Sequence, residues 1–159
     1  MQLLLLRHAD ATTSARIDDL RPLSDKGRQQ AQRVARFCKS RKIQPDLILT
    51  SPFLRAEETA RIVAEELKCE MVLSAFLASG MMPSAAMEEL RAYMRFECVL
   101  LVGHEPDLSA LAGALLGAGN PGAVRMRKAT LAGLAVDTLP PGGTHLEFLV
   151  PAKLMSEKD

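Results

Sequence analysis

Four side chains suited to anion chemistry stand at or shortly after the ends of apolar runs. Arg7 and His8 follow four consecutive leucines, His104 ends a second apolar run, and Arg55 lies shortly after a third. A guanidinium group donates two parallel hydrogen bonds to phosphate oxygens. An imidazole is a nucleophile when it is neutral and a further donor when it is protonated. These residue types predict phosphoryl chemistry that uses one neutral and one protonated imidazole.

The apolar runs have the composition of strands that are covered on both faces. We expect strands at residues 2–6, 47–49, 70–74 and 98–104, alternating with helices at residues 22–42, 56–67, 83–94 and 106–117. Ser24 has the residue type and position of an N-cap for the first helix. The alternation predicts an α/β fold, a three-layer α/β/α sandwich with a mainly parallel sheet.

The last part of the chain has a different pattern. Apolar segments at residues 131–136 and 145–150 flank a Pro-Pro-Gly-Gly sequence at 140–143. This pattern predicts a C-terminal antiparallel hairpin, which closes the sheet and makes it mixed.

Ligands of open α/β sheets bind beyond the carboxyl ends of the strands. The four candidate side chains fall at such ends, although they are far apart in the sequence. We therefore expect them to meet at one rim of the sheet. Helix N-termini that follow the second and fourth expected strands would add positive dipole ends there.

Length and composition predict one globular domain. The chain has 159 residues, 48% of them hydrophobic, and a formal net charge of +1, which fits a domain over residues 1–155 with a short tail at 156–159. This small net charge gives no indication of the basic surface that a nucleic-acid-binding protein needs. The three cysteines, Cys38, Cys69 and Cys98, form no CxxC pair, which favours a reducing cytoplasm. No run approaches the ~20 apolar residues that cross a bilayer, so we expect no membrane partner.

Three motifs, in order, resemble the histidine phosphatase superfamily, which has the phosphoglycerate mutase-like fold. They are "LLLLRHADA", "SPFLRAEETA" and "VGHEPDLSAL", and the segment "RPLSDKGRQQAQ" between the first two is also similar to that family. With the short length, the set resembles the SixA-type phosphohistidine phosphatases most closely. The resemblance spans residues 3 to about 116.

The resemblance implies a role for each matching residue. His8 would be the nucleophile that accepts the phosphoryl group, and Arg7, Arg55 and His104 would grip its oxygens. Arg21 matches a position that often adds to the anion pocket. The implied reaction needs no metal and no cofactor, because the arginines and a protonated His104 take the place of a metal ion.

The chain departs from the wider family pattern at several points. Ala9 stands where Gly is usual, so a methyl group is added after the Arg-His pair. The Asn that mutases carry several residues later is missing. Glu105 follows His104 where Asn or His is usual. Its carboxylate would weaken phosphate binding unless the side chain points away.

The segment after the third expected strand bears on the substrate. Phosphate esters usually need a carboxylic acid there to protonate the leaving alkoxide, but no carboxylate precedes Glu88 and Glu89, which we expect on a helix. An imidazole, whose conjugate acid has a pKa of ~6.5, leaves with little help. The segment is also too short for a large lid. Both points favour a phosphohistidine on a phosphorelay or phosphocarrier protein, removed through a covalent intermediate on His8. Asp10 is a reserve candidate for proton transfer and otherwise a turn or cap residue.

Three other functions are left open. A small-molecule phosphomonoesterase of the same superfamily would prefer sugar phosphates to phosphohistidine proteins. A metal-dependent hydrolase would use His8, Asp10, His104 and Asp107 as ligands. A non-catalytic module would bind phosphate or phosphohistidine without any phosphate appearing on His8.

Overall fold

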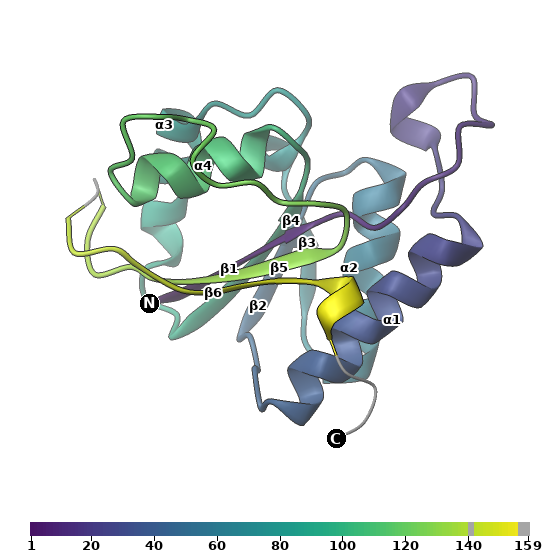
Figure 1. Cartoon of the computed structure of the whole chain (residues 1–159), viewed down its shortest axis with the longest axis horizontal. Helices are drawn as coiled ribbons and strands as arrows, with labels where there is room; N and C mark the ends of the chain where they lie inside the picture. The colour runs from purple at the N-terminus through teal and green to yellow at the C-terminus, as the bar shows by residue number, and fades with distance from the viewer. Residues whose placement is uncertain (140–141, 156–159) are drawn as a thin grey trace.

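A single mixed sheet forms the centre of the molecule. In the computed structural model, which describes residues 1–139 and 142–155, six strands lie in the order β3-β2-β4-β1-β5-β6 (Figure 1). The strands are β1 (Gln2–Arg7), β2 (Leu47–Thr50), β3 (Met71–Leu73), β4 (Cys98–Gly103), β5 (Thr130–Ala135) and β6 (His145–Pro151). β1 to β4 are parallel, β5 is antiparallel to β1, and β6 is antiparallel to β5. β1 and β4 are neighbours, so their carboxyl ends share one edge.

Helices cover both faces of this sheet (Figure 1). One face carries α1 (Asp25–Ser40) and α2 (Leu54–Leu67), and the other carries α3 (Pro83–Leu90) and α4 (Asp107–Leu115). Short 3-10 helices are η1 (Asp18–Leu20), η2 (Ala75–Leu77), η3 (Arg91–Tyr93) and η4 (Ala152–Leu154). The three layers and the antiparallel β5–β6 pair confirm the predicted fold class.

The run of leucines in β1 serves two cores at once. Leu4 and Leu6 pack in the core under α1 and α2, whereas Leu3 and Leu5 pack in the core under α3 and α4. All four are fully buried, because successive side chains of a strand point to opposite faces. Each buried leucine contributes about 1.5–3 kcal/mol. The burial of these leucines therefore fixes the position of Arg7 and His8 at the end of β1.

The observed elements differ from the expected ones mainly at their ends. The third helix ends at Leu90 and continues as the 3-10 helix η3. β3 keeps only three residues, and Val72 and Leu73 are exposed because β3 is an edge strand. Residues 140–141 of the expected turn and the expected tail at 156–159 lie outside the described residues. No helix within the described ranges is both long and apolar enough to cross a membrane.

The start of α1 packs on the loop that follows β1. Ser24 is the N-cap, as predicted, and its Oγ accepts a hydrogen bond from the Gly27 amide at 3.0 Å. The same hydroxyl donates to Asp10 Oδ2 at 2.7 Å. A Cβ at Gly27 would lie 1.9 Å from the Asp10 carbonyl oxygen, so only glycine allows this close approach. The contact holds the chain just after Arg7 and His8 against α1.

Candidate active site

Strand pairing brings the two predicted histidines to the same rim. Arg7 is in register with Gly103 of β4, and the His8 amide donates to the Gly103 carbonyl at 3.0 Å. His104 follows Gly103 directly, so its ring faces the His8 ring with 5.3 Å between centroids. The structure thus places the tips of β1 and β4 side by side.

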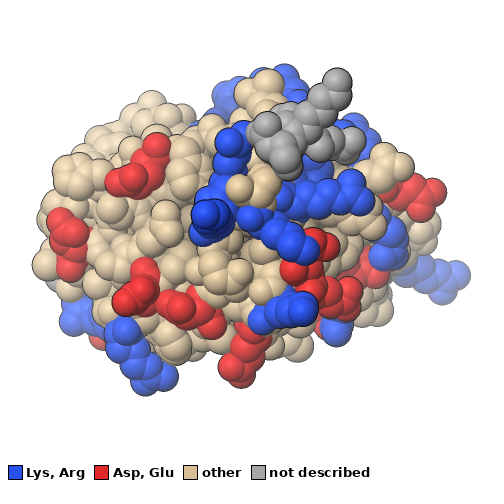
Figure 2. All heavy atoms as spheres, turned by 90° about the horizontal axis from the view of Figure 1, so that it is seen from below, with Lys and Arg blue, Asp and Glu red and all other residues tan. Residues whose placement is uncertain are grey.

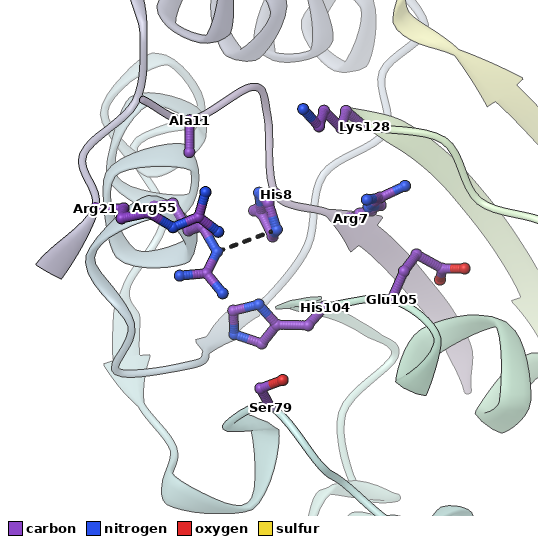
Figure 3. Close-up of a pocket in the computed structure, with 9 residues that line it drawn as sticks. All are labelled: Arg7, His8, Ala11, Arg21, Arg55, Ser79, His104, Glu105 and Lys128. Atoms are coloured by element: carbon purple, nitrogen blue, oxygen red, sulfur yellow. Dashed lines mark hydrogen bonds between the residues drawn. The ribbon is translucent and has the colours of Figure 1, made fainter. Parts of the chain in front are cut away.

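One pocket of about 210 Å³ contains all the predicted site residues (Figure 3). It is lined by Arg7, His8, Ala11, Arg21, Arg55, Ser79, His104, Glu105 and Lys128. Figure 3 shows His8 between Arg7 and Arg55, with His104 across from them. Arg55 is the second residue of α2, which begins shortly after β2 ends. Four cationic side chains therefore line the pocket together with the two imidazoles.

The hydrogen bonds of His8 assign its tautomer. Nδ1 lies 2.8 Å from the Ala9 carbonyl oxygen, which only accepts, so Nδ1 carries the proton. Nε2 then presents its lone pair, to which Arg55 Nε donates at 3.3 Å. Burial lowers the pKa of His8 to about 3, helped by the charges of His104, Arg55 and Arg7 and opposed by the hydrogen bond to Ala9. His8 is thus a neutral imidazole whose Nε2 carries no proton, the form that a nucleophile needs, and that atom accepts a hydrogen bond from Arg55.

His104 is held from the opposite side. Its Nε2 lies 2.7 Å from Ser51 Oγ, its ring lies against Phe53, and its Nδ1 is buried without a partner among the described residues. Burial, and after it the charge of Arg55, lowers the pKa of His104 to about 4. Among these protein groups the ring is neutral at pH 7, whereas the sequence suggested a protonated donor. A phosphoryl dianion beside the ring would raise that pKa, because opposite charge favours the protonated form.

Asp18, which the sequence did not indicate, links two of the predicted clamp residues. Arg55 donates from NH1 to the Asp18 carbonyl at 2.8 Å and from NH2 to Asp18 Oδ2 at 3.1 Å. Arg21 Nε donates to Asp18 Oδ1 at 2.9 Å and also lines the pocket. The Asp18 side chain is 62% exposed, while that of Arg55 is 6% exposed. Both guanidinium groups are thereby turned toward one carboxylate on η1.

Arg7 keeps part of its donor capacity unused. Its NH1 donates to the Met126 carbonyl at 3.1 Å, but its Nε is buried and has no partner in the described part of the chain. Burial lowers the pKa of Arg7, and the nearby charge of Glu105 acts in the opposite direction. An unpaired buried N–H costs free energy. An anion in the pocket would remove that cost.

Two of the three departures from the family pattern, Ala9 and Glu105, leave the pocket open. The Ala9 methyl group is fully buried in the core under α1 and α2, and the Ala9 amide donates to Thr59 Oγ1 at 3.1 Å. The Glu105 carboxylate accepts from the Ser109 amide at 3.1 Å and the Ser109 hydroxyl at 2.5 Å. It caps the start of α4 and points away from His104 (Figure 3).

The carboxylates of the alternative metal site are engaged elsewhere. Asp10 pairs with Lys128 at 2.6 Å and accepts from Ser24, and these contacts lower the pKa of Asp10. Asp107 accepts from the amides of Gly80 and Met81. In residues 1–139 and 142–155, no group of three or more His, Cys, Asp and Glu side chains is arranged to hold a metal ion. Asp10 does not line the pocket either, so it is poorly placed as a proton donor.

Two further supporting residues were present in the quoted motif but were given no role. Ser51 contacts His104, and Thr59 donates to the Arg55 carbonyl at 2.7 Å while accepting from Ala9. Both are fully buried. Ser51 and Thr59 are hydroxyl residues that lie four positions before and four positions after Arg55 in the motif. This spacing is the sequence signal that could have pointed to them. Asp18 lies in a loop without such a pattern, so no comparable signal existed.

Known proteins with similar sequences agree on one family. The family model of the histidine phosphatase superfamily (branch 1) matches residues 3–78. The phosphohistidine phosphatase SixA of Escherichia coli strain K12 is 31% identical over 121 residues, which cover 72% of this chain and 74% of that protein. An uncharacterized protein of Picosynechococcus sp. is 32% identical over 142 residues, or 84% of each chain.

Solved structures share the same architecture. The histidine phosphatase SixA in complex with tungstate has a TM-score of 0.88 at 24% identity, covering 96% of this chain and 98% of that one. A mycobacterial glucosyl-3-phosphoglycerate phosphatase in complex with VO3 has a TM-score of 0.73 at 20% identity, covering 92% and 97%. At these identities the likeness is one of fold. The sequence relatives make the chain a member of the histidine phosphatase superfamily, branch 1, and a SixA-like hydrolase.

Proposed function

We propose that this protein is a metal-independent phosphohistidine phosphatase that removes phosphate from a histidine of a phosphorelay or phosphocarrier protein. The observation that carries the proposal is the state of His8. Its ring is neutral, and its Nε2 carries no proton and accepts a hydrogen bond from the guanidinium of Arg55 inside the pocket. A phosphoryl group held by the arginines would therefore lie directly in front of the nucleophile.

The reaction follows as two in-line displacements. In the first, the His8 Nε2 electron pair forms an N–P bond while the N–P bond to the substrate imidazole breaks, and that imidazole keeps the electron pair. In the second, a water oxygen forms a bond to phosphorus while the His8–phosphorus bond breaks and His8 Nε2 keeps that electron pair. Both protons of the water leave on the product, H2PO4−, which then equilibrates with solvent. Arg7, Arg21, Arg55 and a protonated His104 would stabilise the equatorial oxygens, so catalysis is mostly positioning and charge stabilisation.

The absence of a well-placed acid in the described pocket supports a histidine leaving group. Within residues 1–139 and 142–155, Glu105 is the carboxylate that lines the pocket, and Ser109 holds it away from His104. An alkoxide leaving group would need such an acid. Imidazole, with a conjugate-acid pKa of ~6.5, does not.

The size of the rim supports a protein as the carrier of the phosphohistidine. The segment between β3 and α3 contains η2 and contributes Ser79 to the pocket lining. It spans residues 74–82, too few for a lid that would enclose a metabolite. The E. coli relative is the phosphohistidine phosphatase SixA, which supports the same substrate class.

The test is rapid chemical quench with a phosphohistidine-bearing phosphotransfer protein, followed by turnover on that protein and on sugar phosphates. We expect phosphate to appear on His8, and activity to be lost completely in His8→Ala. His145→Ala removes an exposed histidine of β6 and serves as the matched control. Each of Arg7→Ala, Arg55→Ala and His104→Ala should lower kcat by about 10²–10³-fold.

Several results would overturn the proposal. Hydrolysis retained in His8→Ala would contradict the covalent route, and equal or faster turnover of sugar phosphates would favour a small-molecule phosphomonoesterase. Loss of activity in a chelator would reject the metal-independent mechanism. If the phosphoprotein binds but no phosphate appears on His8, the protein would instead be a non-catalytic binding module.

A further inference from the structure

A second cavity opens beside the catalytic pocket. It has a volume of about 420 Å³ and shares Arg7 and Lys128 with that pocket. Its other lining residues are Lys26, Gln30, Arg127, Pro151, Ala152 and Lys153. We call these eight residues the basic groove. They come from the ends of β1 and β6, from α1, from η4 and from the loop before β5, so the groove is a property of the folded molecule.

The positive charge of the basic groove is largely uncompensated. Lys26, Arg127 and Lys153 are exposed and form no ion pair within residues 1–139 and 142–155. Asp10 is the carboxylate in contact with the groove, through its 2.6 Å pair with Lys128. Five cations therefore face two carboxylates among the described residues, Asp10 in its pair with Lys128 and Glu105 near Arg7, although the whole chain carries a net charge of only +1.

Charged side chains are also unevenly distributed over the larger surface around the groove. Lys and Arg side chains gather around the place where the described chain ends after η4, whereas acidic side chains lie mostly toward the other parts of that face (Figure 2). A concentrated positive potential of this kind attracts acidic partners and raises their rate of association.

We propose that the basic groove docks acidic side chains of the protein that carries the phosphohistidine. The inference rests on the proposed function and adds what the partner must present, namely Asp or Glu residues beside its phosphohistidine. His8 and His104 are 7% and 3% exposed at the bottom of the pocket. A phosphohistidine side chain is short, so a phosphoryl group that reaches His8 brings the partner's surface against the pocket rim and hence against Arg7 and Lys128.

The lining of the groove suits protein side chains. Pro151 and Ala152 provide an apolar wall beside the cations, and carboxylate side chains present both a charged tip and an apolar stem. The groove also extends away from the pocket along α1 and η4, where a partner's neighbouring residues would lie.

The test compares two synthetic peptides that carry one phosphohistidine, flanked by glutamates in one and by glutamines in the other. For the wild type we expect kcat/KM to be at least about tenfold higher for the acidic peptide at about 0.05 M salt, with the difference shrinking at about 0.5 M salt. Lys26→Glu/Lys153→Glu should abolish this preference. Its turnover of p-nitrophenyl phosphate, which is too small to reach the groove, should stay unchanged.

A matched control carries the same change in charge elsewhere. Lys42 and Lys68 are exposed and lie just before β2 and β3, at the opposite edge of the sheet. Lys42→Glu/Lys68→Glu should keep the preference for the acidic peptide. Equal turnover of both peptides by the wild type, or an unchanged preference in Lys26→Glu/Lys153→Glu, would overturn the docking proposal alone. If neither peptide is hydrolysed while p-nitrophenyl phosphate is, the proposed function fails and the docking proposal falls with it.

Discussion

Before a phosphoryl group binds, both imidazoles of the pocket are neutral. His8 and His104 have pKa values of about 3 and about 4, mainly because burial disfavours the charged ring. In the unfolded chain both rings titrate near ~6.5. Folding therefore excludes protons that the unfolded chain would bind.

This difference makes the stability of the protein dependent on pH. As the pH falls from about 6.5 to about 4, the unfolded state takes up protons and the folded state does not. The free energy of unfolding should therefore fall by up to about 1.4 kcal/mol per pH unit for each histidine. Urea unfolding at several pH values measures this slope. His104→Asn should reduce it, and an unchanged slope would contradict the assigned cause.

Asp18 controls how much positive charge the arginines offer to a ligand. Its carboxylate accepts from both Arg55 and Arg21. Burial is the largest single contribution and raises the pKa of Asp18, but the charges and hydrogen bonds of the two arginines together outweigh it and lower that pKa. Arg55 lies in the first turn of α2, where its positive charge is repelled by the positive end of the helix dipole. The carboxylate of Asp18 offsets this repulsion. A phosphoryl group must compete with Asp18 for the same donors.

We expect Asp18→Asn to bind inorganic phosphate about fivefold more tightly, since removing the competing charge frees both guanidinium groups. Competitive inhibition by phosphate is the measurement. Asp19→Asn changes an exposed neighbour whose side chain makes no hydrogen bond or ion pair within residues 1–139 and 142–155, and it should leave the inhibition constant unchanged. Weaker phosphate binding in Asp18→Asn would mean that Asp18 instead orients Arg55.

At the scale of elements, the site depends on how α1 meets the loop after β1. Gly27 allows the first turn of α1 to contact the Asp10 carbonyl, and the Ser24 amide and hydroxyl also bond to Asp10. The chain between His8 and Arg21 is held by these contacts and by the bridge between Ala11 and Leu23.

Gly27→Ala should therefore damage both stability and activity. The added methyl group would force the loop or helix to move, at a cost of about 1–3 kcal/mol. Denaturant unfolding and kcat on p-nitrophenyl phosphate measure the two effects. Gly119→Ala is the matched control, because a Cβ there would meet no atom within 4 Å. A fully stable and active Gly27→Ala protein would refute the proposed packing constraint.

At the scale of the whole molecule, an oxyanion would connect parts that are otherwise separate. Its predicted ligands come from β1, from α2, from the residue after β4 and from the loop after η1. A ligand that binds only the folded state stabilises it by about 2.7 kcal/mol at a hundredfold excess over Kd.

Tungstate at that excess should raise Tm by about 5–10 °C, as expected for a domain of this size. Differential scanning calorimetry measures the shift. His145→Ala should keep the shift and Arg55→Ala should lose it. A shift that survives in Arg55→Ala would place tungstate at another site.

The sequence by itself determined the alternating elements, the leucine-rich β1, the capped start of α1 and the positions of Arg7, His8, Arg55 and His104 at strand ends. These features depend on local patterns of apolar residues and on the rule that parallel strands end at one edge. Only the tertiary structure decided the tautomer of His8, the neutral state of both imidazoles, the link from Asp18 to two arginines and the course of the basic groove. These depend on burial and on contacts between segments far apart in the chain, such as Arg55 with His8 and Lys128 with Asp10, which no local pattern encodes.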